Sequence, residues 1–196
     1  MPNPPPLVRQ WVESTPLAPL GQDIQVFSVI TPPTTQRDTA RQLVRQALRA
    51  ILASHLGCPP AAVPLLSQPG FGLHLTGEKI GLSVSHEAGL SLSAINPAGA
   101  VGVDILKLAT LTMPDDELLR LAREYLGKTT AQQIASLPPS QHWLAFAEAW
   151  THLEAQLKCR GRPLAEWFEQ QQASLEYGQA ISLQLPEGYV GALAIG

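Results

Sequence analysis

The sequence is poor in features that mark several large classes of protein. It contains two cysteines, Cys58 and Cys159, in 196 residues, too few for a disulfide framework or a cysteine-based zinc site. No apolar run approaches the roughly 20 residues that a membrane helix needs. The N-terminus lacks the basic and apolar regions of a secretory signal. We therefore expect free thiols, no membrane partner and a cytoplasmic location.

An excess of positive charge is also missing. The 13 Lys and Arg residues stand against 16 Asp and Glu, for a net charge of −3, so we expect no nucleic-acid partner. Hydrophobic residues make up 45% of the chain and charged residues 15%, proportions that favour a globular fold over disorder. The basic residues can still gather locally around a phosphorylated ligand.

Proline, by contrast, is abundant, with 18 residues, which indicates frequent loops. We expect an extended N-terminal arm over 1–23 and a loop over 57–79. Hydrophobic periodicity predicts helices over 35–56, 115–126 and 141–160. Alternating apolar and small polar residues predict strands over 25–30, 80–85, 90–95, 100–106, 175–185 and 189–195.

The order of these elements suggests an internal repeat. Residues 24–99 and 100–196 each run from a strand through a long helix to a closing pair of strands. We predict an α+β fold of two pseudo-duplicated halves, each a small antiparallel sheet packed against a long helix. Two fused halves can form a site within one subunit, so we expect a monomer.

The last predicted helix carries two charged residues beside its apolar stripe. Phe146, Trp150, Leu153 and Leu157 recur at helical spacing and should face the core. Glu154 and Lys158 stand four residues apart, so their side chains are neighbours on the helix. Taken alone, they are better explained as an ordinary surface ion pair than as a functional site.

An acidic residue lies within the strand predicted over 100–106. Asp104 follows Val101, Gly102 and Val103, and a carboxylate in such surroundings is costly unless it is paired. It is either a solvent-facing or hydrogen-bonded residue, or a ligand. If it meets Glu154, the two carboxylates suit Mg²⁺, which takes one or two carboxylates together with substrate phosphates.

Hydroxyl, imidazole and guanidinium groups provide candidate phosphate ligands. Ser85 and His86 end one predicted strand and can donate hydrogen bonds to a phosphate. Arg41 and Arg45 lie one turn apart on the first long helix. The alternatives are a turn histidine and a solvated basic face.

Together these segments resemble the 4′-phosphopantetheinyl transferases of the surfactin-synthetase-activating type. The resemblance is carried by Ser83–His86 (Ser-Val-Ser-His), Val101–Asp104 (Val-Gly-Val-Asp) and Trp150–Lys158 (Trp-Thr-His-Leu-Glu-Ala-Gln-Leu-Lys). It implies a fold of two similar α/β halves. It also implies transfer of the phosphopantetheine arm of coenzyme A to a serine of an apo acyl or peptidyl carrier protein, with release of adenosine 3′,5′-bisphosphate.

The same resemblance implies roles for individual residues. Asp104 and Glu154 would hold Mg²⁺ against the coenzyme A pyrophosphate, and Glu154, or a water it holds, would help to deprotonate the serine. Lys158 would neutralise charge on the phosphates. The remaining phosphate ligands would be Arg41, Ser85 and His86.

The chain departs from the family pattern at four places. Leu106 replaces a glutamate present in many members, and Leu153 replaces the lysine before Glu154. The Gly-Lys-Pro stretch corresponds to Gly70–His74, which has no lysine, and Glu87 stands where serine is usual. The lost lysines and the added carboxylate should weaken binding of a polyanion.

Two alternatives remain open at this stage. A non-catalytic relative would bind a carrier protein or coenzyme A without transfer. An unrelated α+β protein would keep Asp104 and Glu154 apart.

Overall fold

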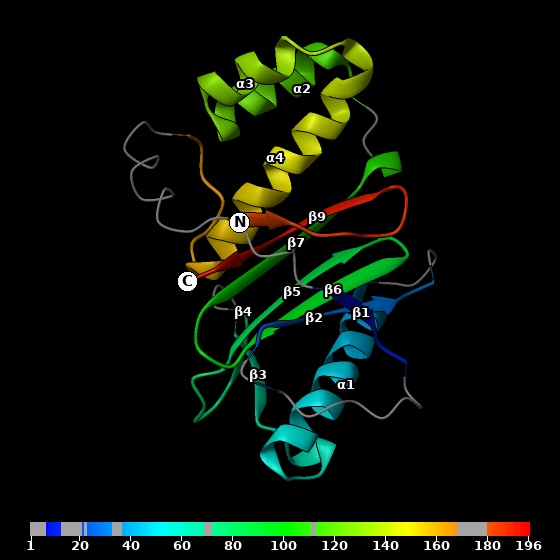
Figure 1. The fold of residues 1–196 in the computed structure, drawn as a ribbon, viewed down its shortest axis with the longest axis vertical. Coiled ribbons are helices and arrows are strands. Elements are labelled where there is room, and N and C mark those ends of the chain that lie inside the picture. Colours follow the sequence, from blue (N-terminus) through cyan, green and yellow to red (C-terminus); the bar gives the residue numbers. More distant parts are fainter. Residues whose placement is uncertain are drawn as a thin grey trace.

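The computed structural model describes residues 7–12, 21, 23–32, 37–68, 72–110, 113–167 and 180–196. Two small sheets lie side by side in the middle of the molecule, with one long helix at one end and a layer of helices at the other (Figure 1). The predicted α+β class is confirmed. That the two halves arose by duplication stays a prediction.

The first sheet has the strand order β1-β2-β6-β5. Strands β2 (Gln25–Ile30), β6 (Leu90–Asn96) and β5 (Gly81–Glu87) are antiparallel, but β1 (Val8–Gln10) runs parallel to β2. The prediction of a purely antiparallel sheet is therefore wrong at this edge. Residues 8–10 form a strand because Val8 packs against a buried cluster, and the following residue, Trp11, donates its backbone N–H to Ser28 O over 2.8 Å.

Helix α1 (Arg37–Leu56) covers one face of this sheet and confirms the predicted first helix over its described residues. Its apolar face includes Leu48, Ile51 and Leu52, which are almost completely buried against Phe27 and Ile95. Burial of such a face, rather than helix propensity, stabilises a helix of this kind in water. Its opposite face is left for charged residues.

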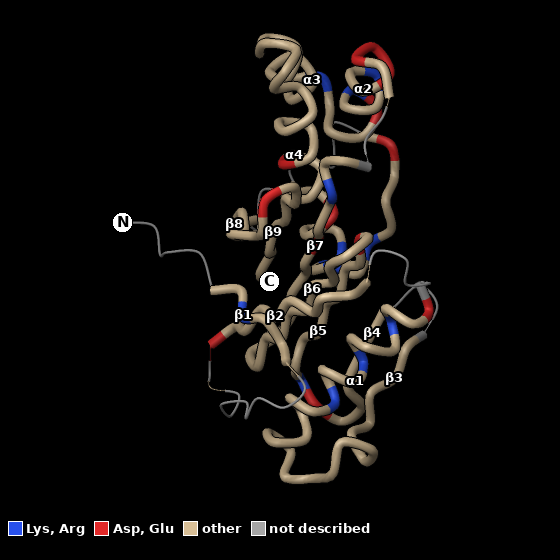
Figure 2. The backbone as a smooth tube through the Cα atoms, turned by 90° about the vertical axis from the view of Figure 1, so that its right-hand side faces the viewer, with Lys and Arg blue, Asp and Glu red and all other residues tan. Residues whose placement is uncertain are grey.

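The loop predicted over 57–79 is wrong. After a short 3₁₀ helix (Pro60–Ala62), strands β3 (Leu65–Gln68) and β4 (Gly72–Leu75) form an antiparallel pair. The backbone of this hairpin runs beside α1 in the side view (Figure 2). The prolines flank these strands instead of interrupting them, and buried Leu65 pairs with buried Leu75. Residues 69–71 lie outside the described part.

The second sheet is antiparallel, with the order β7-β9-β8. Strands β7 (Val101–Lys107) and β9 (Tyr189–Ile195) match their predictions, whereas β8 covers only Ala180–Ser182 of the strand predicted over 175–185. Residues 168–179 lie outside the described part. Leu183 keeps one hydrogen bond to the sheet, from its backbone N–H to Gly191 O over 2.8 Å.

The helical layer is built from α2 (Asp115–Leu121), a π-helical segment (Ala122–Leu126), α3 (Lys128–Ala135) and α4 (Pro139–Cys159). Helices were predicted over 115–126 and 141–160, but α3 was not. It has only two buried residues, Ala131 and Ile134, too short a pattern to indicate a helix. No helix in the described ranges is long and apolar enough to cross a membrane.

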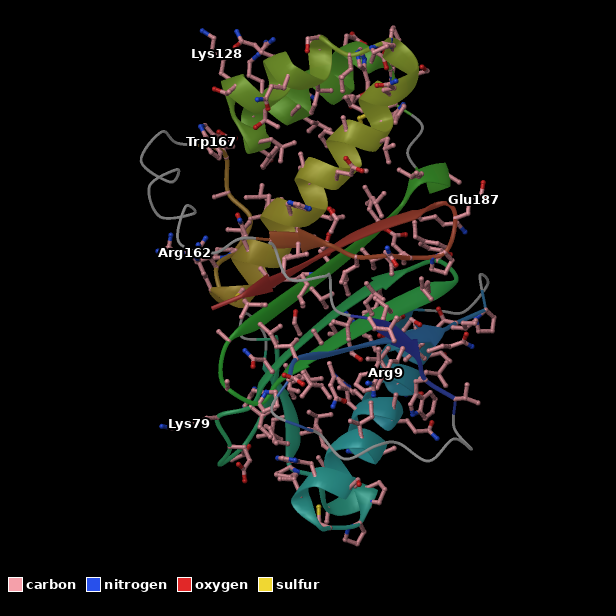
Figure 3. All side chains as sticks on the ribbon, in the orientation of Figure 1. Arg9, Lys79, Lys128, Arg162, Trp167 and Glu187 are labelled. Atoms are coloured by element: carbon pink, nitrogen blue, oxygen red, sulfur yellow. The ribbon has the colours of Figure 1, made fainter. Side chains whose placement is uncertain are left out.

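The predicted apolar stripe of α4 faces the core of this layer. Phe146, Leu153 and Leu157 are buried there, and the Trp150 ring stacks on Phe146 with centroids 5.5 Å apart. Beyond α4 the chain returns to the layer, where Trp167 donates its backbone N–H to Glu124 O over 2.6 Å (Figure 3). Because this apolar stripe is buried, the rotation of α4 about its own axis is fixed. The direction in which the polar side chains of α4 point is then fixed as well.

Candidate active site

The site begins where the two sheets meet, at strands β5 and β7. Two serine hydroxyls of β5 join the strands: Val103 donates its backbone N–H to Ser83 Oγ over 2.9 Å, and Ser85 Oγ donates to Asp104 Oδ1 over 2.7 Å. Both serines are buried. Alternate residues of a strand share a face, which explains why Ser83 and Ser85 both reach β7.

Helix α4 approaches β7 unusually closely at Gly102. A Cβ on Gly102 would overlap the carbonyl oxygen of Ala155 and lie 2.5 Å from Cys159 N. Only a residue without a side chain permits this distance between strand and helix. Asp104 shares the face of Gly102, and Glu154 and Lys158 are close neighbours of the two α4 residues that Gly102 contacts. The close approach therefore brings all three charged groups to one place.

Lys158 forms the centre of a hydrogen-bonded cluster. Its Nζ lies 2.7 Å from Asp104 Oδ1, 3.1 Å from Ser85 Oγ and 3.2 Å from Val103 O. An ammonium group has three N–H donors, and each finds an oxygen here. The Asp104 side chain is 9% exposed and that of Lys158 is 31% exposed. A buried carboxylate is thus paired with a cation that still reaches solvent.

Two further carboxylates experience the charge of Asp104. Burial raises the pKa of Glu154, the charge of Asp104 raises it further, and Lys158 offsets part of the rise. Burial also raises the pKa of Glu87, with Asp104 adding to the rise and Lys107 opposing it. Asp104 and Glu154 are therefore close enough to interact electrostatically, as a shared cation would require. The ion pair that the described residues show is Lys158 with Asp104, rather than the surface pair of Glu154 with Lys158 that was the alternative explanation of these two residues.

The donor set fits a hard cation that is completed by a ligand. Within the described residues, no group of three or more His, Cys, Asp or Glu side chains can hold a metal ion. Asp104 and Glu154 would provide two carboxylates, as in a magnesium site whose other ligands are waters and substrate phosphates. Charge supports the same conclusion, because the charge of Asp104 contributes to the raised pKa of Glu154, and a cation beside both carboxylates would offset this repulsion.

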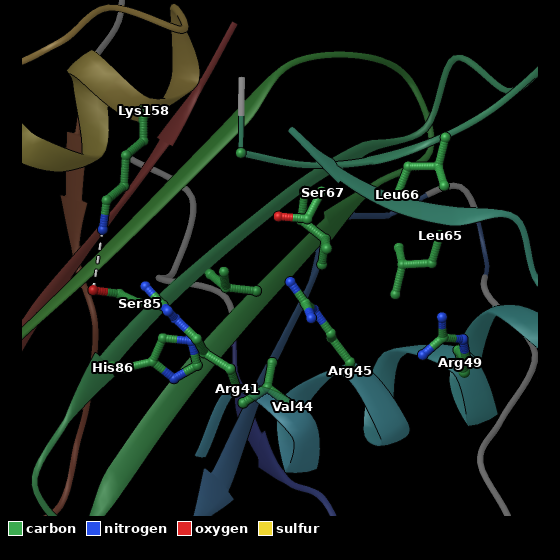
Figure 4. Close-up of a pocket in the computed structure, with 13 residues that line it drawn as sticks. Arg41, Val44, Arg45, Arg49, Leu65, Leu66, Ser67, Ser85, His86 and Lys158 are labelled. Atoms are coloured by element: carbon green, nitrogen blue, oxygen red, sulfur yellow. Dashed lines mark hydrogen bonds between the residues drawn. The ribbon is translucent and has the colours of Figure 1, made fainter. Parts of the chain in front are cut away.

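A cavity of about 930 Å³ opens beside this cluster. Among the described residues that line it, four are Arg or Lys and none is Asp or Glu. Its walls come from α1, the β3–β4 hairpin, β5 and the end of α4 (Figure 4). The lining residues are Arg41, Val44, Arg45, Arg49, Leu65, Leu66, Ser67, Gly72, Leu73, Val84, Ser85, His86 and Lys158.

The cavity brings together four of the residues singled out from the sequence. Arg41, Ser85, His86 and Lys158 all line it, and Figure 4 shows them gathered toward one end. His86 is oriented by a 2.9 Å hydrogen bond between its Nδ1 and Ser91 Oγ. Asp104 lies directly behind Ser85 and Lys158 through the bonds described above.

Other lining residues were missed. Arg49 was not considered, although it continues the four-residue spacing of Arg41 and Arg45, and Arg45 was noted beside Arg41 but received no role from the family resemblance. The hairpin residues were missed because their segment was predicted to be a loop.

The structure also changes the meaning of two departures from the family pattern. Leu153 is buried among the apolar residues of the helical layer, so its replacement of a lysine fills that core. Glu87 lies near enough to Asp104 that the two carboxylates interact, since the charge of Asp104 contributes to the raised pKa of Glu87.

Comparison with known proteins identifies the second half of the chain. The model of the 4′-phosphopantetheinyl transferase superfamily matches residues 100–190. This part of the chain, which contains β7 and α4, is similar to that superfamily. The chain is 30% identical over 129 residues to "4′-phosphopantetheinyl transferase HetI" from Nostoc sp. strain PCC 7120. This alignment covers 64% of this chain and 53% of that protein. The chain is 27% identical over 130 residues to "Putative 4′-phosphopantetheinyl transferase slr0495" from Synechocystis sp. strain PCC 6803, covering 65% and 51%.

The match to these transferases is partial in two respects. The aligned segment spans about half the length of each relative. The superfamily match begins at β7, so it includes Asp104, Glu154 and Lys158 but not Arg41 or His86. The family model therefore does not cover the cationic walls that the first half contributes.

Proposed function

We propose that the protein transfers the 4′-phosphopantetheine arm of coenzyme A to a serine hydroxyl of an apo acyl or peptidyl carrier protein. The observation that carries the proposal is a cavity lined by cations that ends at the Asp104–Lys158 cluster, in a chain whose net charge is −3. A polyanionic ligand gains the most binding free energy from such a lining, since opposite charges within a few ångströms interact strongly in a partly desolvated site.

The reaction is a phosphoryl transfer. The serine oxygen forms a bond to the pantetheine-side phosphorus of the coenzyme A pyrophosphate, and the bond from that phosphorus to the bridging oxygen breaks. Adenosine 3′,5′-bisphosphate leaves with the bridging oxygen. The serine proton passes to Glu154 or to a water that Glu154 holds. Positioning and charge stabilisation supply most of the catalysis in this class of reaction.

Residues of this chain divide that work. Arg41 and His86 hold the phosphates at one end of the cavity by charge-assisted hydrogen bonds. Ser85, whose O–H donates to Asp104 in the free protein, joins them by turning its hydroxyl to a phosphate oxygen, and Lys158 redirects one of its N–H groups from Asp104 to the pyrophosphate. Asp104 and Glu154 would hold Mg²⁺, which would neutralise charge on the pyrophosphate oxygens. The raised pKa of Glu154 suits it to accept a proton.

The test is the intact mass of apo carrier proteins from the same organism after incubation with enzyme, coenzyme A and Mg²⁺. We expect a mass gain of one phosphopantetheine arm, its loss with a chelator and its return with added Mg²⁺. The Glu154→Gln variant provides the matched inactive control. Absence of any gain with every such carrier would contradict the proposal.

A second function is favoured by one observation. Glu87 adds a negative charge near Asp104, which opposes phosphate binding and suits a relative that binds without transfer. Calorimetry separates the two functions: a protein that binds coenzyme A or carrier and forms no product supports the second. If Glu87 is the obstacle, Glu87→Ser should restore transfer.

A further inference from the structure

The turn between β5 and β6, residues 88–89, is held by side chains of the second sheet. The hydroxyl of Tyr189, the first residue of β9, donates a hydrogen bond to Ala88 O over 2.6 Å. Lys107 Nζ, at the end of β7, donates to the same carbonyl over 3.3 Å and lies 5.6 Å from the centre of the Tyr189 ring. The turn and the loop that leads into β9 lie on the same side of the molecule (Figure 1). At this point, therefore, side chains of one sheet hold a turn of the other.

Gly89 is closely fitted to this contact. Its φ of +96° favours glycine, and a Cβ at this position would lie only 2.6 Å from the Tyr189 hydroxyl oxygen. The Gly89 carbonyl accepts a hydrogen bond from the backbone N–H of Thr31, just after β2, over 3.1 Å. Both carbonyls of the turn are thus bonded, one by the first sheet and one by the second, so the turn is held from two sides.

This contact lies at the far end of β5 from the connection between the two sheets. At the start of β5, Gly81 packs against the β6–β7 connection, where a Cβ would overlap Gly99 O. Farther along, β5 bonds to β7 through the side chains of Ser83 and Ser85. In the described part of the chain the two strands belong to different sheets. The hydrogen bond from Tyr189 therefore holds the one end of β5 that the chain connection does not.

The same end of β5 carries a residue of the candidate site. His86 stands two residues before Ala88 and lines the cavity, whereas Asp104 and Lys158 belong to the second sheet and to α4. The bond between His86 Nδ1 and Ser91 Oγ joins β5 to β6, and both of these strands enter the turn. It therefore orients the imidazole within the first sheet, but the distance from His86 to the cluster depends on the position of the turn.

We propose that Tyr189 is a positioning residue for coenzyme A binding, whose hydroxyl holds the β5–β6 turn so that His86 meets the phosphates at a fixed distance from Asp104 and Lys158. The inference rests on the proposed function, because it takes coenzyme A as the ligand. Tyr189 is not among the described residues that line the cavity, so it acts through the turn. Without the hydroxyl, binding must also order the turn, and that ordering reduces affinity.

The test compares wild type with Tyr189→Phe, which removes the hydroxyl and keeps the ring beside Lys107. Calorimetry measures coenzyme A binding in the presence of Mg²⁺, with no carrier protein. We expect Tyr189→Phe to bind coenzyme A about 3- to 10-fold more weakly, which is the loss expected from one hydrogen bond. Tyr125→Phe is the matched control, because the Tyr125 ring packs on Trp150 in the helical layer, and it should bind as wild type does.

A double-variant cycle with His86→Ala separates positioning from a general loss of structure. If Tyr189 acts through His86, Tyr189→Phe should cause no further weakening in a protein that already carries His86→Ala. Equal weakening in both backgrounds would overturn the inference. A Tyr189→Phe variant that binds coenzyme A as tightly as wild type would overturn it as well. Circular dichroism of each variant checks that the fold is retained.

Two other outcomes distinguish this inference from the proposed transfer. If the cycle behaves as expected but wild-type protein modifies no carrier, the role of Tyr189 stands and only the transfer fails. If the wild-type protein does not bind coenzyme A, both proposals fail.

Discussion

At the Lys158 end of the cavity, side chains from three elements bond to one another, whereas at the Arg49 end two guanidinium groups face the cavity from a single helix. The first end is part of the packing between β5, β7 and α4. The second end is a charged helix face whose own packing depends on apolar residues on the other side of α1. Substitutions should therefore affect folding and function together at the Lys158 end, and ligand binding alone at the Arg49 end.

The largest effect on stability is expected from Gly102→Ala. The added Cβ would overlap Ala155 O, so α4 would have to move away from β7. We expect a loss of about 3 kcal/mol or more in unfolding free energy, which lowers Tm by about 6–12 °C, together with loss of transfer. Thermal unfolding measures the first. The matched control is Gly21→Ala, where the Cβ would meet nothing closer than Asp23 N at 3.9 Å. A Gly102→Ala variant as stable as wild type would show that the close approach of α4 to β7 does not contribute to stability.

The next largest effect is expected from Asp104→Ala. It leaves the half-buried Lys158 ammonium with Ser85 Oγ and Val103 O but without its anion. Removing one partner of a buried pair costs about 3–5 kcal/mol, and partial exposure of Lys158 should reduce this to about 2–3 kcal/mol. Chemical denaturation gives the value. The double variant Asp104→Ala with Lys158→Met should recover part of the loss, and no recovery would contradict the pairing.

Glu154→Gln should act in the opposite direction on stability. The folded-state pKa of Glu154 is raised, so its stabilising contribution is complete below the unfolded pKa and is lost as pH rises through the folded value. Removing the charge should raise Tm of the free protein by about 1–3 °C near pH 8, with the difference vanishing near pH 4. Transfer should fall about 100-fold or more. A lower Tm at pH 8 would contradict the electrostatic origin of the shift.

The smallest effect on stability is expected at the Arg49 end. Arg49→Gln should change unfolding free energy by less than about 0.5 kcal/mol, since it removes no ion pair within the described residues and glutamine is a good helix former. Denaturant unfolding checks this. A clear loss of stability would show that Arg49 is structural and would remove the contrast between the two ends.

The sequence predicted the elements with a long or regular pattern. The long helices α1 and α4 follow from apolar spacing, and β7 follows from the alternation of Val101, Val103 and Ile105 with smaller or charged residues. The β3–β4 hairpin did not, because its proline-rich flanks conceal two short strands. The short helix α3 buries too few residues to leave a pattern.

The site was predictable in its residue types and less so in its contacts. Asp104, Glu154 and Lys158 were singled out from the strand and helix patterns, the family resemblance gave their roles, and a surface pair of Glu154 with Lys158 was the alternative explanation. The pairing of Lys158 with Asp104 joins residues 54 positions apart, and it depends on the close contact at Gly102, a long-range packing feature. Arg45 and Arg49 gain their meaning from the hairpin opposite them, which the sequence did not reveal.

The most direct test of the proposed transfer is to measure the amount of each product formed in one reaction of enzyme, coenzyme A, Mg²⁺ and an apo carrier protein. We predict that modified carrier, measured by intact mass, and adenosine 3′,5′-bisphosphate, measured by chromatography, appear in equal amounts with wild-type protein and fall together in Glu154→Gln. Release of the bisphosphate without modified carrier, or equal product from wild type and Glu154→Gln, would contradict it.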